Sequence, residues 1–113
     1  MSAKYLINCQ DGFNSPERAT IAFILAVSAS KQAEVAVFAT ADAAALCVQG
    51  AAQGVQAEGY EALAALMSDF IANGGRIWLC PACAKAKNIT PGDLAEGVEI
   101  AGAPRTMAFL ESG

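Results

Sequence analysis

The chain has 113 residues, of which 55% are hydrophobic and only 16% are charged, and its formal net charge is −4. This composition excludes a disordered polymer and predicts a single domain, residues 1–113, with a modest core. The acidic balance, with no basic cluster larger than Lys85 and Lys87, argues against binding to nucleic acid or to an anionic membrane surface.

Short apolar runs alternate with helical patterns from the first residues onward. A buried strand is expected at residues 5–9, where the run Tyr-Leu-Ile-Asn-Cys stops at a Gln-Asp-Gly turn. Asn14 or Ser15 can cap the helix that follows to about residue 30, with Pro16 near its first turn. Because this helix is apolar almost all round, we expect one face to pack on the sheet and another on a second subunit.

The middle of the chain predicts a second strand and two more helices. The strand is expected at residues 35–39, and a short alanine-rich helix follows it and reaches Cys47. Residues 49–59 contain three glycines and indicate a loop, with a short extra strand considered at Val55. Apolar residues at spacings of three and four predict an amphipathic helix over residues 60–71, which Asn-Gly-Gly then stops.

A third apolar strand is expected at residues 77–80, and a short helix follows at once, from Pro81 to about Lys87. After a turn, residues 98–100 indicate an edge strand and residues 104–110 a closing helix. Parallel strands need crossover connections, so this alternation predicts an α/β fold. We expect three layers, with a mostly parallel sheet of four or five strands and helices on both of its faces.

The chain contains four cysteines and no histidine, which restricts its chemistry. Catalysis of the Ser-His-Asp or Cys-His type and metal sites with histidine ligands are excluded. No signal-peptide pattern is present, and the longest uncharged apolar stretch, residues 19–30, is too short to span a bilayer. We therefore expect a cytoplasmic protein, in which cysteines are free, catalytic or metal-bound rather than structural disulfides.

Cys80 is expected where a strand ends at the carboxyl edge of the sheet and a helix begins, which is where reactive groups gather in open parallel sheets. Unpaired N–H groups at a helix start favour a thiolate over a thiol. Cys83 falls one helical turn later, on roughly the same side. The two cysteines are thus the candidate catalytic pair: they could form a reversible disulfide, or Cys83 could resolve a modified Cys80.

Other interpretations of the cysteines remain open. A C-x-x-C turn can also be structural, and Cys9 and Cys47 are expected to be packing residues. Zinc would need four ligands, which only Cys9, Cys47 and carboxylates could complete, so we expect no metal. A helix start after the Gln-Asp-Gly turn could face a phosphate, but G-x-G-x-x-G and the P-loop pattern are both absent, so we expect no cofactor.

The segment around the two cysteines resembles a known family. Residues 74–89, Gly-Gly-Arg-Ile-Trp-Leu-Cys-Pro-Ala-Cys-Ala-Lys-Ala-Lys-Asn-Ile, are similar to the strand-end segment of DsrE/TusD/YchN-like proteins. In that family, a cysteine that closes a strand opens a short helix ending in a basic residue. The resemblance covers nearly the whole chain and implies a flavodoxin-like fold of the DsrE/YchN type. It includes residues 16–19, 35–38 and 58–63.

By its spacing to Ile89, Cys80 falls where the sulfur-carrying cysteine of DsrE and TusD members lies. The resemblance implies a persulfide carrier or sulfurtransferase, assembly into a homotrimer or homohexamer, and sulfur donor and acceptor proteins as partners. The chain differs from the family in having Asn88 where a glycine is common, and in adding Cys83. The alternatives are a thiol–disulfide redox protein that uses the Cys80/Cys83 couple and a non-enzymatic assembly or binding module.

Overall fold

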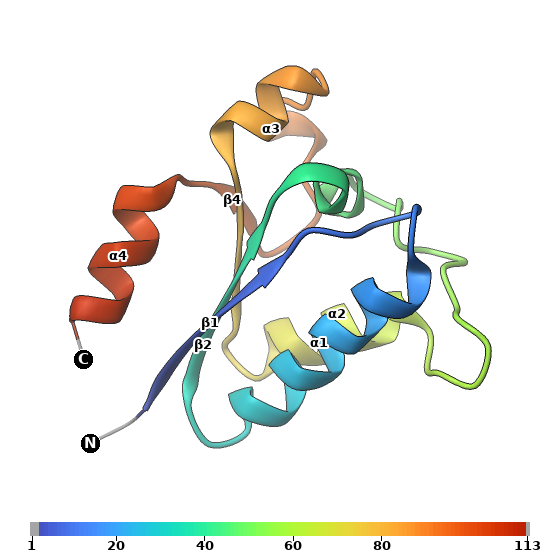
Figure 1. Ribbon diagram of the computed structural model, residues 1–113, viewed down its shortest axis with the longest axis horizontal. Coiled ribbons are helices and arrows are strands. Elements are labelled where there is room, and N and C mark those ends of the chain that lie inside the picture. The colour runs from blue at the N-terminus through green and yellow to red at the C-terminus, as the bar shows by residue number, and fades with distance from the viewer. Residues whose placement is uncertain (1–2, 113) are drawn as a thin grey trace.

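Four parallel strands form the centre of the computed structural model, which describes residues 3–112 (Figure 1). Their order in the sheet, β1-β2-β3-β4, follows their order in the chain, and every neighbouring pair is parallel. The strands are β1 (Lys4–Cys9), β2 (Glu34–Ala39), β3 (Arg76–Leu79) and β4 (Val98–Ile100). The predicted α/β class, with a parallel sheet and helices on both faces, is therefore confirmed.

Helical segments connect the strands and cover the sheet. They are α1 (Pro16–Ser30), the 3-10 helix η1 (Ala41–Cys47), α2 (Leu63–Ala72), α3 (Pro81–Ala86), the 3-10 turn η2 (Pro91–Asp93) and α4 (Ala103–Glu111). Because the strand order advances in one direction, right-handed crossovers place α1 and α2 on the same face. The α4 helix lies on the opposite face (Figure 1).

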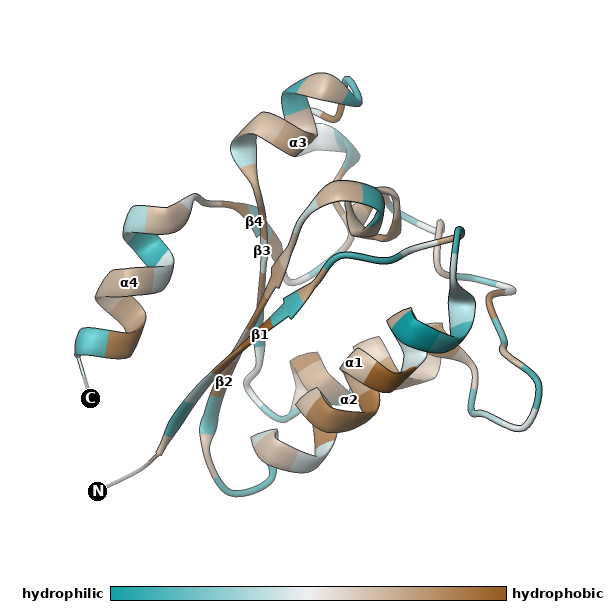
Figure 2. Cartoon of the chain, viewed as in Figure 1, coloured by the Kyte–Doolittle hydropathy of each residue, from teal (hydrophilic) through white to brown (hydrophobic). Residues whose placement is uncertain are grey.

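The larger core lies between the sheet and the α1/α2 layer, where the rings of Phe23 and Phe70 meet edge to face at 6.1 Å. Figure 2 shows apolar residues concentrated in the central strands and in these two helices. The largest buried side chains of this core include Phe70, Leu63, Ile77, Leu79 and Val37. A strand that is buried on both faces has an almost continuous run of apolar residues in the sequence. For this reason β2 and β3 could be predicted from the sequence.

A smaller core lies under α4 on the other face of the sheet. Trp78 of β3 packs edge to face against Phe109 of α4, with ring centroids 5.5 Å apart, and Ala36 and Ala101 complete the cluster. Trp78 is buried, as expected, but its indole N–H has no hydrogen-bond partner.

The α1 helix begins as predicted, with Ser15 at its N-cap position and Pro16 in its first turn. The Ser15 side chain makes no capping hydrogen bond. On the outer side of α1, three large apolar residues are exposed: Ile21 (40%), Ile24 (38%) and Leu25 (57%). We call these three residues the α1 ridge. Within residues 3–112, no helix combines the length and the apolar character needed to cross a membrane.

The extra strand considered at Val55 is wrong, because residues 49–62 form turns, a bend and irregular chain, and the isolated β-bridge just before them pairs Val48 with Leu94. Gly54 and Gly59 on either side of it both have a φ of 84°, a left-handed backbone that interrupts an extended chain. The carbonyl of Val55 instead accepts the N–H of Leu63 at 3.0 Å, which ties the loop to the start of α2.

Two helices differ in detail from expectation. The α2 helix begins at Leu63, three residues after the predicted start, and the Tyr60 hydroxyl outside it donates to Glu17 of α1 at 3.2 Å. Tyr60 therefore lies in the preceding loop, although its spacing fits the helical pattern, and the extended backbone of Ala62 (ψ 133°) marks the start of the helix. The alanine-rich helix after β2 is present but has 3-10 geometry.

Candidate functional site

Cys80 lies at the junction of β3 and α3, at the carboxyl edge of the sheet. Its backbone N–H donates to the carbonyl of Ala39 at 3.0 Å, which continues the pairing with β2. Its carbonyl accepts the N–H of Ala84 at 2.9 Å, the first hydrogen bond of α3. Pro81 occupies the first turn of this helix, where its missing N–H has no consequence. The sequence prediction for the place of Cys80 is therefore confirmed.

The Cys80 thiol is partly exposed, and its pKa is lowered. The backbone N–H of Cys83 has the largest effect on this pKa, and the Cys83 side chain and the Ala82 N–H lower it further. Partial burial acts in the opposite direction but does not outweigh these groups. Since the thiolate is the nucleophilic form of cysteine, these surroundings favour reaction at Cys80.

Cys83 lies one turn further along α3 and is held from a different part of the chain. Its sulfur accepts a hydrogen bond from the backbone N–H of Ala41, 3.2 Å away, at the start of η1. Cys83 also packs against the larger core, although it remains partly exposed. Ala41 has a φ of 51°, which is unusual for a residue with a Cβ and marks local backbone strain.

Two polar residues, Asn8 near the end of β1 and Thr40 just after β2, lie at the same edge of the sheet as Cys80. The Thr40 hydroxyl donates to the Asn8 side-chain oxygen at 3.1 Å, which joins the ends of these two strands. Ala39 pairs with Leu79, so Thr40 and Cys80 occupy neighbouring positions at the sheet edge. Sequence reasoning missed both polar residues, although Asn8 stands out as a polar residue inside an apolar strand.

Cys9 and Cys47 have a different environment, since both are buried. Burial raises the pKa of Cys9. It also raises the pKa of Cys47 to about 12, with a smaller contribution from Cys9. The Cys47 thiol donates weakly to the carbonyl of Ala43 at 3.9 Å. The expectation that these two cysteines serve packing agrees with their burial in the larger core.

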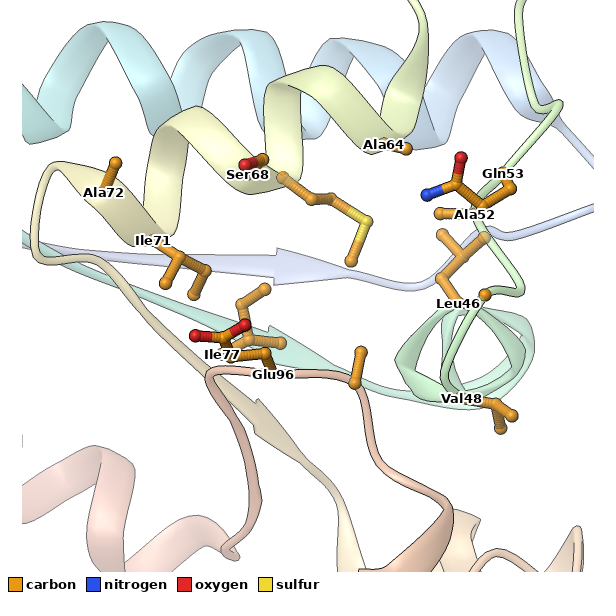
Figure 3. Close-up of a pocket in the computed structure, with 13 residues that line it drawn as sticks. Leu46, Val48, Ala52, Gln53, Ala64, Ser68, Ile71, Ala72, Ile77 and Glu96 are labelled. Carbon is orange, nitrogen blue, oxygen red and sulfur yellow. The ribbon is translucent and has the colours of Figure 1, made fainter.

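Two further features bear on what the molecule could bind. Within residues 3–112, no group of three or more Cys, Asp or Glu side chains could hold a metal ion. A cavity of about 400 Å³ lies between α2, η1 and the loop before β4 (Figure 3). Its wall is mostly apolar, with Leu46, Val48, Met67, Ile71, Ile77 and Ala95 among the lining residues. None of the four cysteines lines this cavity, so it is separate from the thiol pair.

Comparison with known sequences identifies relatives over most of the chain. The DsrE/DsrF-like family matches residues 3–113. Over 107 residues the chain is 30% identical to the uncharacterized protein MJ0760 of Methanocaldococcus jannaschii. That match covers 94% of this chain but 38% of MJ0760, so the chain spans less than half the length of this relative.

Two solved structures have a similar fold. The crystal structure of the YchN protein from E. coli aligns with a TM-score of 0.72 and 20% identity, over 100% of this chain and 95% of YchN. MTH1491 of Methanobacterium thermoautotrophicum, a protein of unknown function, aligns with a TM-score of 0.65 and 15% identity, over 94% of this chain and 87% of that protein. These two likenesses concern the fold alone. The family match over residues 3–113 confirms the resemblance seen in the sequence: the chain belongs to the DsrE/DsrF-like family.

Proposed function

We propose that Cys80 accepts a sulfane sulfur as a persulfide and passes it on, so that the protein acts as a sulfur carrier. One observation carries this proposal, the contrast among the four thiols. Cys80 is partly exposed and its pKa is lowered, whereas Cys9 and Cys47 are buried and their pKa values are raised. Membership of the DsrE/DsrF-like family supports the proposal. The partners it requires are a sulfur donor and a sulfur acceptor protein.

The loading step is a displacement at sulfur. The Cys80 thiolate attacks the outer sulfur of a donor persulfide, R–S–SH, and a new S–S bond forms on Cys80. The S–S bond of the donor breaks, and the donor leaves as the thiolate R–S⁻. Sulfur and charge balance, and no further oxidant or reductant is needed. The same N–H groups that lower the pKa of Cys80 would also stabilise the negative charge of its persulfide.

The proposal is tested by intact mass after incubation with glutathione persulfide. The test uses the Cys83→Ser variant, because in this variant no neighbouring thiol can react with the persulfide on Cys80. This variant is expected to gain about 32 Da, one sulfur atom, and to lose it on treatment with a reductant. Cys80→Ser should gain no such mass, while Cys83→Ser combined with Cys47→Ser serves as the matched control and should still load. Loading that persists without Cys80 would contradict the proposal.

A second candidate is a thiol–disulfide redox protein that uses the Cys80/Cys83 couple. The observation in its favour is the interaction between the two side chains, through which Cys83 helps to lower the pKa of Cys80. Mild oxidation should then close an internal disulfide in the wild type but not in Cys83→Ser. Peptide mapping that finds both thiols free after oxidation would exclude this candidate.

A further inference from the structure

Cys80, at the N-cap of α3, and Cys83, within this helix, are not equivalent. Cys80 lies at the strand end and is partly exposed, while Cys83 packs against the larger core and accepts the N–H of Ala41 at 3.2 Å. The backbone N–H of Cys83 and its side chain both lower the pKa of Cys80. Both thiols are partly exposed, and the surroundings that lower the pKa of Cys80 favour attack by its thiolate on an incoming donor.

We infer that, when no acceptor protein is bound, Cys83 discharges the Cys80 persulfide, so that the sulfur then leaves the protein as hydrogen sulfide. This inference rests on the persulfide proposed above and names the product that it yields. The inference also requires a second substrate besides the persulfide donor: a dithiol that reduces the resulting Cys80–Cys83 disulfide.

The discharge step balances without an outside oxidant. Cys83 attacks the inner sulfur of the persulfide, which is Sγ of Cys80, and forms the Cys80–Cys83 disulfide. The bond between the two persulfide sulfurs breaks, and the outer sulfur leaves with both protons as hydrogen sulfide. The sulfane sulfur is reduced while the two cysteine sulfurs are oxidised to the disulfide. A dithiol then exchanges with the disulfide and returns both cysteines to thiols, leaving as its own disulfide.

Proximity favours this internal step over transfer to another protein. A thiol tethered one helical turn away has an effective concentration of about 1 mM or more. Cys80 is the N-cap residue of α3 and Cys83 lies in the first turn of that helix, so the disulfide would close within a single turn.

Single-turnover loading tests the inference. Reduced protein is mixed anaerobically with one equivalent of glutathione persulfide, and released sulfide is measured with monobromobimane alongside the intact mass. The wild type should release about one sulfide per chain and become about 2 Da lighter through disulfide formation. Cys83→Ser should retain the added sulfur and release about tenfold less sulfide, since only external thiols can then act.

Three controls separate the possible outcomes. Cys83→Ala should behave like Cys83→Ser, which excludes an effect of the new hydroxyl at the Ala41 N–H. Cys47→Ser should behave like the wild type, and added dithiothreitol should allow the wild type a second turnover. If the wild type and Cys83→Ser both keep the added sulfur, the inference is overturned and the proposed carrier function stands. If neither takes up sulfur nor forms a disulfide, the carrier function itself fails.

Discussion

The backbone N–H of Ala41 donates a hydrogen bond to the sulfur of Cys83 across 42 positions of the chain, at a distance of 3.2 Å. The position of Cys83 therefore depends on the loop after β2 as well as on its own helix. Ala41 makes this contact from a φ of 51°, a conformation that costs an alanine roughly 1 kcal/mol or more. The surroundings of the thiol pair thus include a strained residue from outside the C-x-x-C segment.

Gly12 supports this arrangement, because a Cβ at this position would collide with the backbone carbonyl of Asp42, next to Ala41. Gly12→Ala is expected to destabilise the fold by about 1–3 kcal/mol in urea unfolding, since backbone must move to make room. It should also change the rate at which Cys80 and Cys83 form a disulfide. Gly92→Ala is the matched control: its nearest neighbour is the Thr90 hydroxyl at 3.8 Å, and we expect no measurable loss. Equal stability of the two variants would contradict this account.

The four thiols are expected to differ in alkylation rate, with Cys80 fastest. Its lowered pKa means that the thiolate is present at a lower pH than in an ordinary cysteine, so its labelling rate should reach a plateau at a lower pH than that of an ordinary cysteine. Cys47, buried with a pKa of about 12, should label only on unfolding. Iodoacetamide labelling across a pH series, mapped by peptide, gives the order directly. If Cys80 labels no faster than Cys47 in the folded protein, a thiolate mechanism is untenable and the assembly-module alternative gains support.

Burial of Cys47 should make stability fall in alkaline solution. The unfolded chain loses this proton near the ordinary value of 9.0, whereas the folded chain keeps it until about 12. Stabilisation by the retained proton is thus fully present below pH 9.0 and is lost as the pH rises toward 12. The loss approaches about 1.4 kcal/mol per pH unit for one group.

Comparison with Cys47→Ser isolates this effect from the titration of lysine and tyrosine. The serine hydroxyl does not titrate and can still donate to the carbonyl of Ala43. Urea unfolding between about pH 8 and pH 11 should show a shallower decline for the variant than for the wild type. Identical slopes would mean that Cys47 titrates normally in the fold.

Trp78 combines strong packing with an unsatisfied indole N–H, and the two effects act in opposite directions. Trp78→Ala removes the contact with Phe109 and should cost about 3–5 kcal/mol. Trp78→Phe keeps an aromatic ring and removes the buried N–H, so it should cost less than about 2 kcal/mol. Urea unfolding followed by circular dichroism compares both variants. Similar losses for the two would indicate that the N–H has a partner, such as a bound water.

We propose that the protein assembles into a homo-oligomer, a trimer or a hexamer, through the α1 ridge. Ile21, Ile24 and Leu25 project from a helix whose other face already packs on the core. Leu25→Glu should therefore shift the species seen by light scattering toward the monomer. Met107→Glu, at an apolar residue of α4 with similar exposure (48%), is the control and should not change the assembly. If light scattering shows that the wild type is a monomer at micromolar concentration, this proposal is contradicted.

Local signals predicted the central strands and the Cys80 junction correctly, because Ile77 to Cys80 is an apolar run followed directly by a proline. The start of α2 was not predictable in this way. The spacing of Tyr60 fits the helix, but its hydroxyl bonds to Glu17 of α1 and the N–H of Leu63 bonds back to the carbonyl of Val55 in the loop. Helical periodicity describes one segment at a time, whereas this boundary depends on a contact with another helix.

The surroundings of Cys80 show the same limit more sharply. Asn8 of β1 and Thr40, which follows β2, lie at the same sheet edge as Cys80, and this placement follows from the sheet register, which the sequence does not specify. Ala41 contributes a backbone N–H to Cys83. Neither the alanine itself nor the residues beside it in the sequence indicate that its φ is positive. The reactive cysteines could be proposed from the sequence, but the groups that hold them could not.

The α4 helix has a consequence for how the protein is made. It follows all four strands in the chain, yet it supplies Phe109, which covers Trp78 on the second face of the sheet. During translation, the ribosome therefore releases a nearly complete sheet before the segment that closes this face. For that interval, Trp78 and Ala36 are exposed to water and to other nascent chains. Packing of α4 is therefore the step that closes this apolar face to other chains.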